Sequence, residues 1–247
     1  MRILIYIPII HSGPDMGSMA DELTRKGIAE FGERFWQKHV DTVRQYWDAI
    51  ARCCESLGIT KGGFKIYQDG MVADGEIAMK IIIDSVKAGS RNYEIIAELT
   101  GKGAVIEKTE DFDLVRKEVE MLKTIPASGA LVMKLIGLGR FKILRSRLLR
   151  QRDRYIARRI EETLGTGETG LIFLGAYHSI INKLHKDICV IEMKEIGKVR
   201  QYQQTLPFYK SKKEKLEELS SYLIEPIGDF NDRIRKIRCE KHHSVSR

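Results

Sequence analysis

The sequence has few of the residues that mark the more specialised classes of protein. Its 247 residues include only four cysteines and five prolines, and 8% of them are aromatic. Cys53 and Cys54 are neighbours, and no cysteines occur at the paired spacing of a disulfide framework. Proline and glycine are too sparse for a disordered chain. These absences favour a folded protein with free thiols, which is typical of the cytoplasm.

Long apolar stretches are also missing. The apolar piece at 127–139 is shorter than the roughly 20 residues that span a bilayer, and it contains Lys134. The N-terminal segment MRILIYIPII has a short apolar part with no small-residue cleavage site after it, so we interpret it as a strand. We therefore expect a cytoplasmic protein without a membrane segment.

The motifs of several enzyme classes are absent as well. The sequence has no H-E-x-x-H zinc motif, no Walker phosphate loop, no dinucleotide-binding glycine pattern and no G-x-S-x-G nucleophile elbow. The segment GTGETG at 165–170 follows a predicted helix rather than a strand, so we interpret it as a turn. Any catalytic site must therefore be built from residues that lie apart in the sequence.

What the sequence does contain is an alternation of apolar strands and amphipathic helices. This pattern predicts an α/β fold with a central, mainly parallel sheet and flanking helices. We expect one α/β domain over 1–232, with a helical subregion around 111–165, followed by a basic, mobile tail at 233–247. The predicted strands are 2–10, 64–67, 104–107, 171–174 and 186–193, and the main predicted helices are 20–57, 74–88, 91–100, 111–123, 141–164, 211–223 and 229–238.

Histidines and carboxylates follow several of these strands. His11 comes after the first strand, and His178 follows the apolar run 171–174, which is typical of a strand buried on both faces. Ligands bind at the carboxyl ends of strands in α/β sheets, so the two histidines are expected to share a pocket. The predicted metal ligands are His11, His178, Asp15 and Asp69 for a divalent cation. His11 and His178 are also predicted catalytic residues, as ligands or as a general base, and Asp15, Asp69 or the predicted catalytic carboxylate Glu107 would orient water.

The predicted helix at 141–164 is rich in arginine. On a helical wheel its apolar arc also contains four charged residues, Arg145, Arg152, Asp153 and Arg159. Another four arginines, Arg147, Arg150, Arg154 and Arg158, point away from that arc. A buried charge must snorkel, pair with a counter-charge or serve a site. The two alternatives are an internal ion pair or a catalytic role, in which Arg152 would stabilise negative charge and Asp153 would position it or a histidine.

Two short motifs resemble the TraB/TIKI-type families of the erythromycin-esterase/ChaN-like superfamily. They are Arg152-Asp153-Arg154-Tyr155-Ile156-Ala157 and Gly175-Ala176-Tyr177-His178. Those families pair the second motif with an earlier G-x-x-H at the end of the first strand. Here Pro8-Ile9-Ile10-His11 keeps the histidine but not the glycine. The resemblance implies metal-dependent hydrolysis of peptides or esters, or haem binding.

Three hypotheses follow from the sequence. The first is metal-assisted hydrolysis of a small-molecule or peptide substrate at the strand ends. The second is nucleic-acid or anion binding, because the net charge is +8 and the excess is concentrated in the arginine-rich helix and the tail from Arg233 to Arg247. The third is a catalytically inactive scaffold with the same fold.

Overall fold

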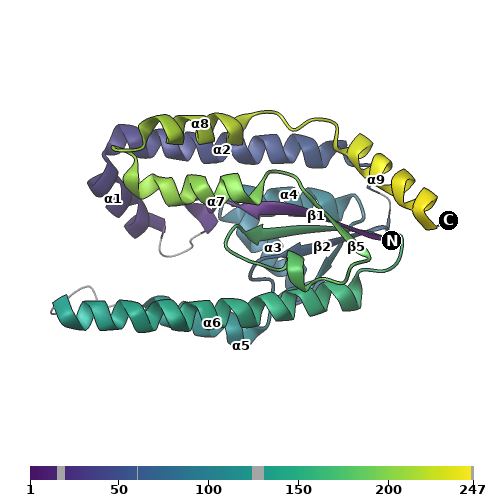
Figure 1. The fold of residues 1–247 in the computed structure, drawn as a ribbon, viewed down its shortest axis with the longest axis horizontal. Helices are drawn as coiled ribbons and strands as arrows, with labels where there is room; N and C mark the ends of the chain where they lie inside the picture. The colour runs from purple at the N-terminus through teal and green to yellow at the C-terminus, as the bar shows by residue number, and fades with distance from the viewer. Residues whose placement is uncertain (16–19, 60, 124–130, 246–247) are drawn as a thin grey trace.

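A five-stranded parallel sheet lies at the centre of the chain (Figure 1), in a computed structural model that describes residues 1–15, 20–59, 61–123 and 131–245. The strand order is β3-β2-β4-β1-β5, and every neighbouring pair is parallel. This confirms the α/β fold class. The strands are β1 (Arg2–Ile9), β2 (Phe64–Gln68), β3 (Val105–Glu107), β4 (Thr169–Gly175) and β5 (Ile188–Glu192).

The middle strand, β4, explains the apolar run in the sequence. Residues 171–174 are all 0% exposed because helices cover both faces of the sheet. β4 pairs with β2 on one side and β1 on the other, with Gln68 opposite Phe173 and Ile9 opposite Gly175. This register brings the ends of three strands level, so residues just past Gln68, Gly175 and Ile9 share one edge.

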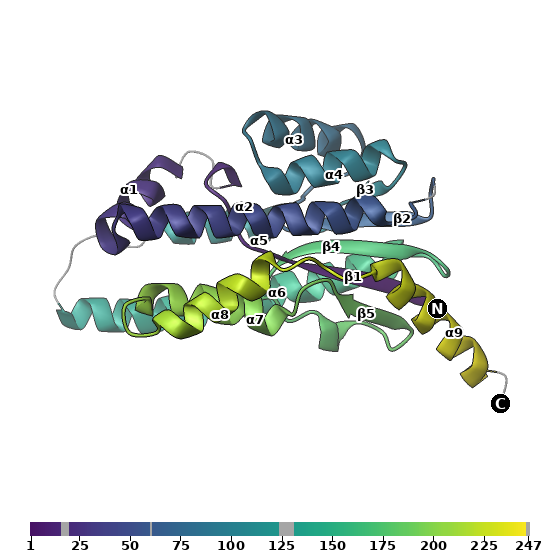
Figure 2. The ribbon, with the colours of Figure 1, turned by 90° about the horizontal axis from the view of Figure 1, so that it is seen from above.

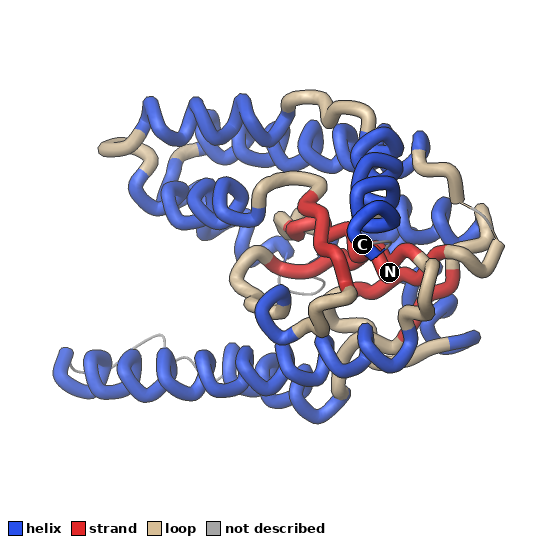
Figure 3. Tube along the Cα trace, turned by 45° about the vertical axis from the view of Figure 1, so that its right-hand side comes forward, coloured by secondary structure: helices blue, strands red, loops and turns tan. Residues whose placement is uncertain are grey.

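Helices flank the sheet on both faces. Figures 1 and 3 show α6 on one face and α2 on the other, with the sheet between them. In Figure 2, α3 and α4 lie beside β2 and β3, whereas α7 and α8 lie on the side of β5. The helices are α1 (Ala20–Phe31), α2 (Glu33–Ser56), α3 (Gly75–Lys87), α4 (Arg91–Gly101), α5 (Phe112–Lys123), α6 (Leu131–Thr163), α7 (Ile196–Thr205), α8 (Lys213–Ile224) and α9 (Phe230–Val245).

Four helical predictions need correction, and the first is the start of α6, which lies at Leu131 and not at the predicted residue 141. The predicted helix at 20–57 is two helices, because Gly32 has φ of 83°, a left-handed conformation that ends α1 and precedes α2. Helix α7 was not predicted, since its sequence IGKVRQYQQT is largely polar and carries Gly197 near its start. Helix α9 extends to Val245, beyond the predicted end at 238 and through most of the basic tail.

Helix α6 divides its charges almost as the helical wheel predicted. Arg152 and Asp153 are 5% and 2% exposed, and Arg159 is partly buried. The four arginines predicted to point outward are all exposed. The prediction was wrong for Arg145, which is exposed. Among the described residues, no helix combines the length and apolarity needed to cross a membrane.

Candidate active site at the strand ends

The ends of β2 and β4 position the first two residues of the site. Asp69 directly follows β2, and its backbone N–H donates to the carbonyl of Phe173, which continues the sheet pairing by one residue. After β4 the chain turns, and the N–H of His178 donates to the carbonyl of Gly175 at 3.1 Å. Asp69 Oδ2 accepts from the N–H of Gly175 at 3.1 Å, which joins the two strand ends.

His178 is held between two carboxylates. Its Nδ1 lies 2.7 Å from Oδ1 of Asp153 on α6, and its Nε2 lies 3.7 Å from Oδ2 of Asp69. The other oxygen of Asp153 accepts from the N–H of Ser179 at 3.1 Å and lies 3.6 Å from Nζ of Lys183. Asp153 therefore fixes both the turn and the imidazole orientation, which leaves Nε2 directed at Asp69.

Arg152 lies at the centre of a second set of contacts. Its guanidinium donates to both carboxylate oxygens of Glu110, at 2.5 and 3.2 Å, and to Asp69 Oδ1 at 2.6 Å. It also donates to Glu118 on α5. The side chains of Arg152 and Glu110 are 6% and 0% exposed. All three guanidinium nitrogens thus contact carboxylates, so Arg152 offsets part of the negative charge of the site.

Burial and charge act in opposite directions on the ionisable groups. Burial lowers the pKa of His178, but the hydrogen bond to Asp153 and the charge of Asp69 outweigh it, so the net pKa lies above the ordinary 6.5. Burial raises the pKa of Asp69, but the charges of His178 and Arg152 bring it below 3.8. For Glu110, burial outweighs the hydrogen bond from Arg152, and the pKa is raised.

The structure brings together only some of the residues predicted for the site. His178, Asp69, Arg152 and Asp153 lie together. His11 is exposed, makes no hydrogen bond or ion pair with a described residue, and does not belong to the cluster around His178.

Asp15 and Glu107 are engaged elsewhere. Asp15 accepts hydrogen bonds from the N–H and the hydroxyl of Ser12, both at 2.7 Å, and from Ser90. Glu107 lies in the neighbouring strand β3 and pairs with Lys65 of β2 at 2.8 Å. Their carboxylates therefore stabilise a turn and a strand pair, and neither belongs to the cluster around His178.

Glu110 and Glu118 were not predicted as site residues from the sequence. The N–H of Glu110 donates to the carbonyl of Met71 at 2.9 Å, which ties Glu110 to the segment after β2. Glu118 reaches Arg152 because α5 packs against α6. The inward position predicted for Arg152 implies that carboxylates lie beside it. The sequence pattern does not identify which carboxylates these are.

Three side chains of the site have the chemistry of a cation site. Asp69, Glu110 and His178 each offer one ligand atom, and those atoms lie within 4.8 Å of one another. Two carboxylates and one imidazole suit borderline or hard divalent cations. The contact of His178 Nδ1 with Asp153 is the outer contact that orients metal-binding histidines in many proteins. The donor set therefore fits a divalent cation.

Comparisons with protein-family models, with curated proteins and with solved structures found no match. The function of the site must therefore be argued from its own geometry.

Proposed function

We propose that the chain is a metal-dependent hydrolase whose site lies between the ends of β2 and β4. The observation that carries this proposal is the convergence of Asp69, Glu110 and His178 within 4.8 Å, with Asp153 orienting the imidazole. The resemblance of the motifs at 152–157 and 175–178 to the TraB/TIKI-type families adds support. A peptide or an ester is the corresponding class of substrate.

The residues of the site would have distinct roles in hydrolysis. A divalent cation held by the three donors would supply Lewis-acid chemistry and lower the pKa of water. Nε2 of neutral His178 would bind the cation, since Nδ1 contacts Asp153, which holds the imidazole in the required orientation. A carboxylate of the cluster would accept the proton of an attacking water. The proton then passes to the leaving amine or alcohol as the carbonyl–heteroatom bond breaks. Arg152 limits the repulsion among the carboxylates.

Metal binding by Glu110 variants tests this proposal. We expect the purified protein to bind one equivalent of Mn²⁺ or Zn²⁺ in calorimetry, and Glu110→Gln to weaken binding about tenfold or more because a charged donor is lost. Glu107→Gln is the matched control, since Glu107 pairs with Lys65 outside the cluster. Hydrolysis of p-nitrophenyl acetate should follow the same order. Absence of stoichiometric binding, or equal losses of affinity in both variants, would contradict the proposal and favour the inactive scaffold.

A second candidate function is binding of nucleic acid, and the exposed face of α6 favours it. Arg147, Arg150 and Arg154 are exposed and form no ion pair with a described residue. Binding should weaken steeply as salt is raised. We expect the triple variant Arg147→Gln/Arg150→Gln/Arg154→Gln to bind more weakly. The slope of its log binding constant against log salt concentration should fall by an amount equivalent to up to about three phosphate contacts, measured by fluorescence anisotropy with double-stranded and single-stranded DNA. Arg44→Gln on α2 is a single-charge control, and salt-insensitive binding would exclude this function.

A further inference from the structure

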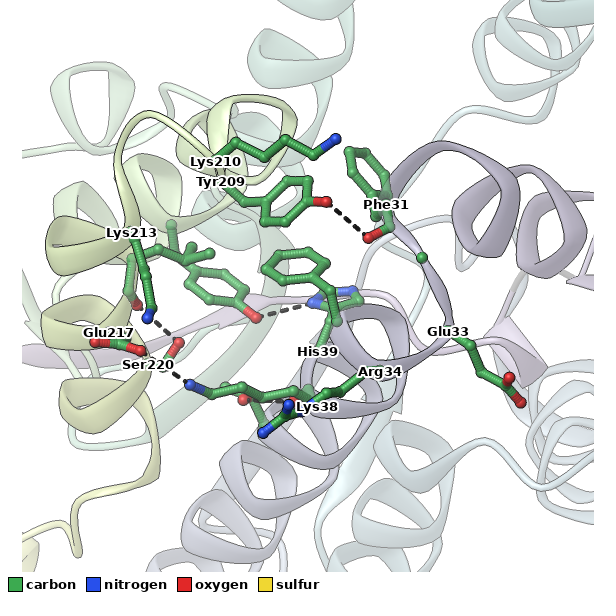
Figure 4. Close-up of a pocket in the computed structure, with 15 residues that line it drawn as sticks. Phe31, Glu33, Arg34, Lys38, His39, Tyr209, Lys210, Lys213, Glu217 and Ser220 are labelled. Carbon is green, nitrogen blue, oxygen red and sulfur yellow. Dashed lines mark hydrogen bonds and ion pairs between the residues drawn. The ribbon is translucent and has the colours of Figure 1, made fainter.

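A cavity lies away from the strand-end site, between α2 and α8. Its volume is about 680 Å³, within the range of pockets that hold small organic ligands. It is lined by the end of α1, the first half of α2, Tyr202 of α7, the segment after the 3-10 helix η3 (Leu206–Phe208), and the start of α8. Figure 4 shows the side chains that line it.

One wall of this cavity is aromatic. Phe35 and Tyr209 have ring centroids 4.0 Å apart, and Phe31 packs edge-on against Tyr209 at 5.8 Å. The Tyr209 hydroxyl donates to the carbonyl of Phe31 at 2.8 Å, which fastens the end of α1 to the segment after η3 (Figure 4). All three rings remain partly accessible. The wall is therefore a preformed apolar surface on which a planar group can pack.

Neutral polar groups lie beside the aromatic wall. Nδ1 of His39 lies 2.8 Å from the hydroxyl of Tyr202, and burial lowers the pKa of His39 to about 4. His39 is therefore uncharged at neutral pH. The deeper part of the cavity therefore contains an uncharged hydrogen-bonded pair. An apolar ligand can bind against this pair without the free-energy cost of removing water from a charged group.

Basic side chains also line the cavity. Four basic residues line the cavity: Arg34 and Lys38 on α2, Lys210 in the segment after η3, and Lys213 at the start of α8. Lys38 pairs with Glu217 at 3.4 Å, whereas Arg34 and Lys210 pair with no carboxylate among the described residues. The other lining acid, Glu33, points away from the rings in Figure 4. The cavity therefore has an excess of positive charge beside an aromatic surface.

From this combination we infer that the cavity binds an organic anion with a planar apolar body, such as an aromatic carboxylate, sulfonate or phosphate. The body packs against Phe35 and Tyr209, and the basic residues that line the cavity, Lys210 among them, attract the anionic group. The inference does not rest on the strand-end site, and metal binding there can fail without affecting it.

Binding of 8-anilino-1-naphthalenesulfonate to matched lysine variants tests the inference. Lys210 and Lys212 each lie over an aromatic ring, at 5.7 and 5.3 Å, but only Lys210 lines the cavity. We expect Lys210→Gln to raise the dissociation constant about threefold to fivefold, and Lys212→Gln to leave it unchanged. The measurement is fluorescence titration of the full chain at low ionic strength.

Two further comparisons separate a specific site from diffuse attraction. Phe35→Leu should weaken binding of the probe, whereas Phe208→Leu should not, since exposed Phe208 lies outside this cavity; thermal denaturation monitors the folding of both variants. 2-Naphthoate should displace the probe at lower concentrations than neutral 2-naphthalenemethanol. Equal losses in Lys210→Gln and Lys212→Gln, or equal competition by the neutral and anionic naphthalenes, would overturn the inference.

Discussion

Replacing Arg152 by methionine is expected to lower the free energy of unfolding by about 3–5 kcal/mol, because removal of one partner leaves buried charges without compensation. Arg152 contacts Asp69, Glu110 and Glu118, and the Glu110 side chain is 0% exposed. Urea unfolding measured by circular dichroism provides the value.

The neighbouring arginine provides the control for this prediction. Arg154 is exposed on the same helix, and Arg154→Met should change the free energy of unfolding by less than about 0.5 kcal/mol. The penalty for Arg152→Met should also shrink at acidic pH, because a protonated Glu110 no longer requires a counter-charge. Combining Arg152→Met with Glu110→Gln should cost less than the sum of the single changes. A loss below about 1 kcal/mol for Arg152→Met would mean that the carboxylate contacts contribute little.

Replacing His178 by asparagine is expected to reduce divalent-cation affinity on the order of 100-fold, with loss of any cation-dependent hydrolysis. His178 is a proposed donor, and Asp153→Asn, which alters only its orienting contact, should reduce affinity by about 10–100-fold. Calorimetry with Mn²⁺ or Zn²⁺ measures both effects. His185→Asn is the matched control, because His185 also lies close to an aspartate, Asp187 at 2.6 Å, but is exposed and outside the cluster.

The pH dependence of this affinity provides a second readout. A protonated imidazole cannot bind a cation, so affinity should fall as pH decreases through the pKa of His178, which lies above 6.5 in the cation-free protein. In Asp153→Asn the hydrogen bond that raises this pKa is weakened, so the fall should occur at lower pH. If affinity in the wild-type protein is independent of pH between about 6 and 8, His178 is not a donor.

The separation between the strand-end site and the aromatic cavity suggests a molecule with two independent binding regions. The strand-end site is acidic and buried, with Asp69, Glu110 and Asp153 near one imidazole. The cavity between α2 and α8 is aromatic and is also lined by basic residues. Ligands of opposite charge should therefore prefer different regions, and the two sets of variants can be tested separately.

Much of the candidate site follows from local sequence patterns. Strand-end positions predicted Asp69 and His178, because a parallel sheet collects ligand-binding residues at its carboxyl edge. Helical periodicity predicted that Arg152 and Asp153 face inward, and both are buried. The same periodicity failed for Arg145, since burial also depends on whether another element covers that turn of the helix. His11 shows the same limit: its strand was predicted, but its side chain is exposed.

The sequence by itself determined the alternation of strands and helices, the inward face of α6 and the two residues that follow β2 and β4. These features depend on the period of the apolar pattern and on local breakers, which act over a few residues. Only the tertiary structure decided which charges meet. Arg152 is separated by 42 residues from Glu110 and by 83 from Asp69, and Asp153 by 25 residues from His178. Strand order, register and helix packing bring these groups into contact, and no local pattern in the sequence encodes those distances.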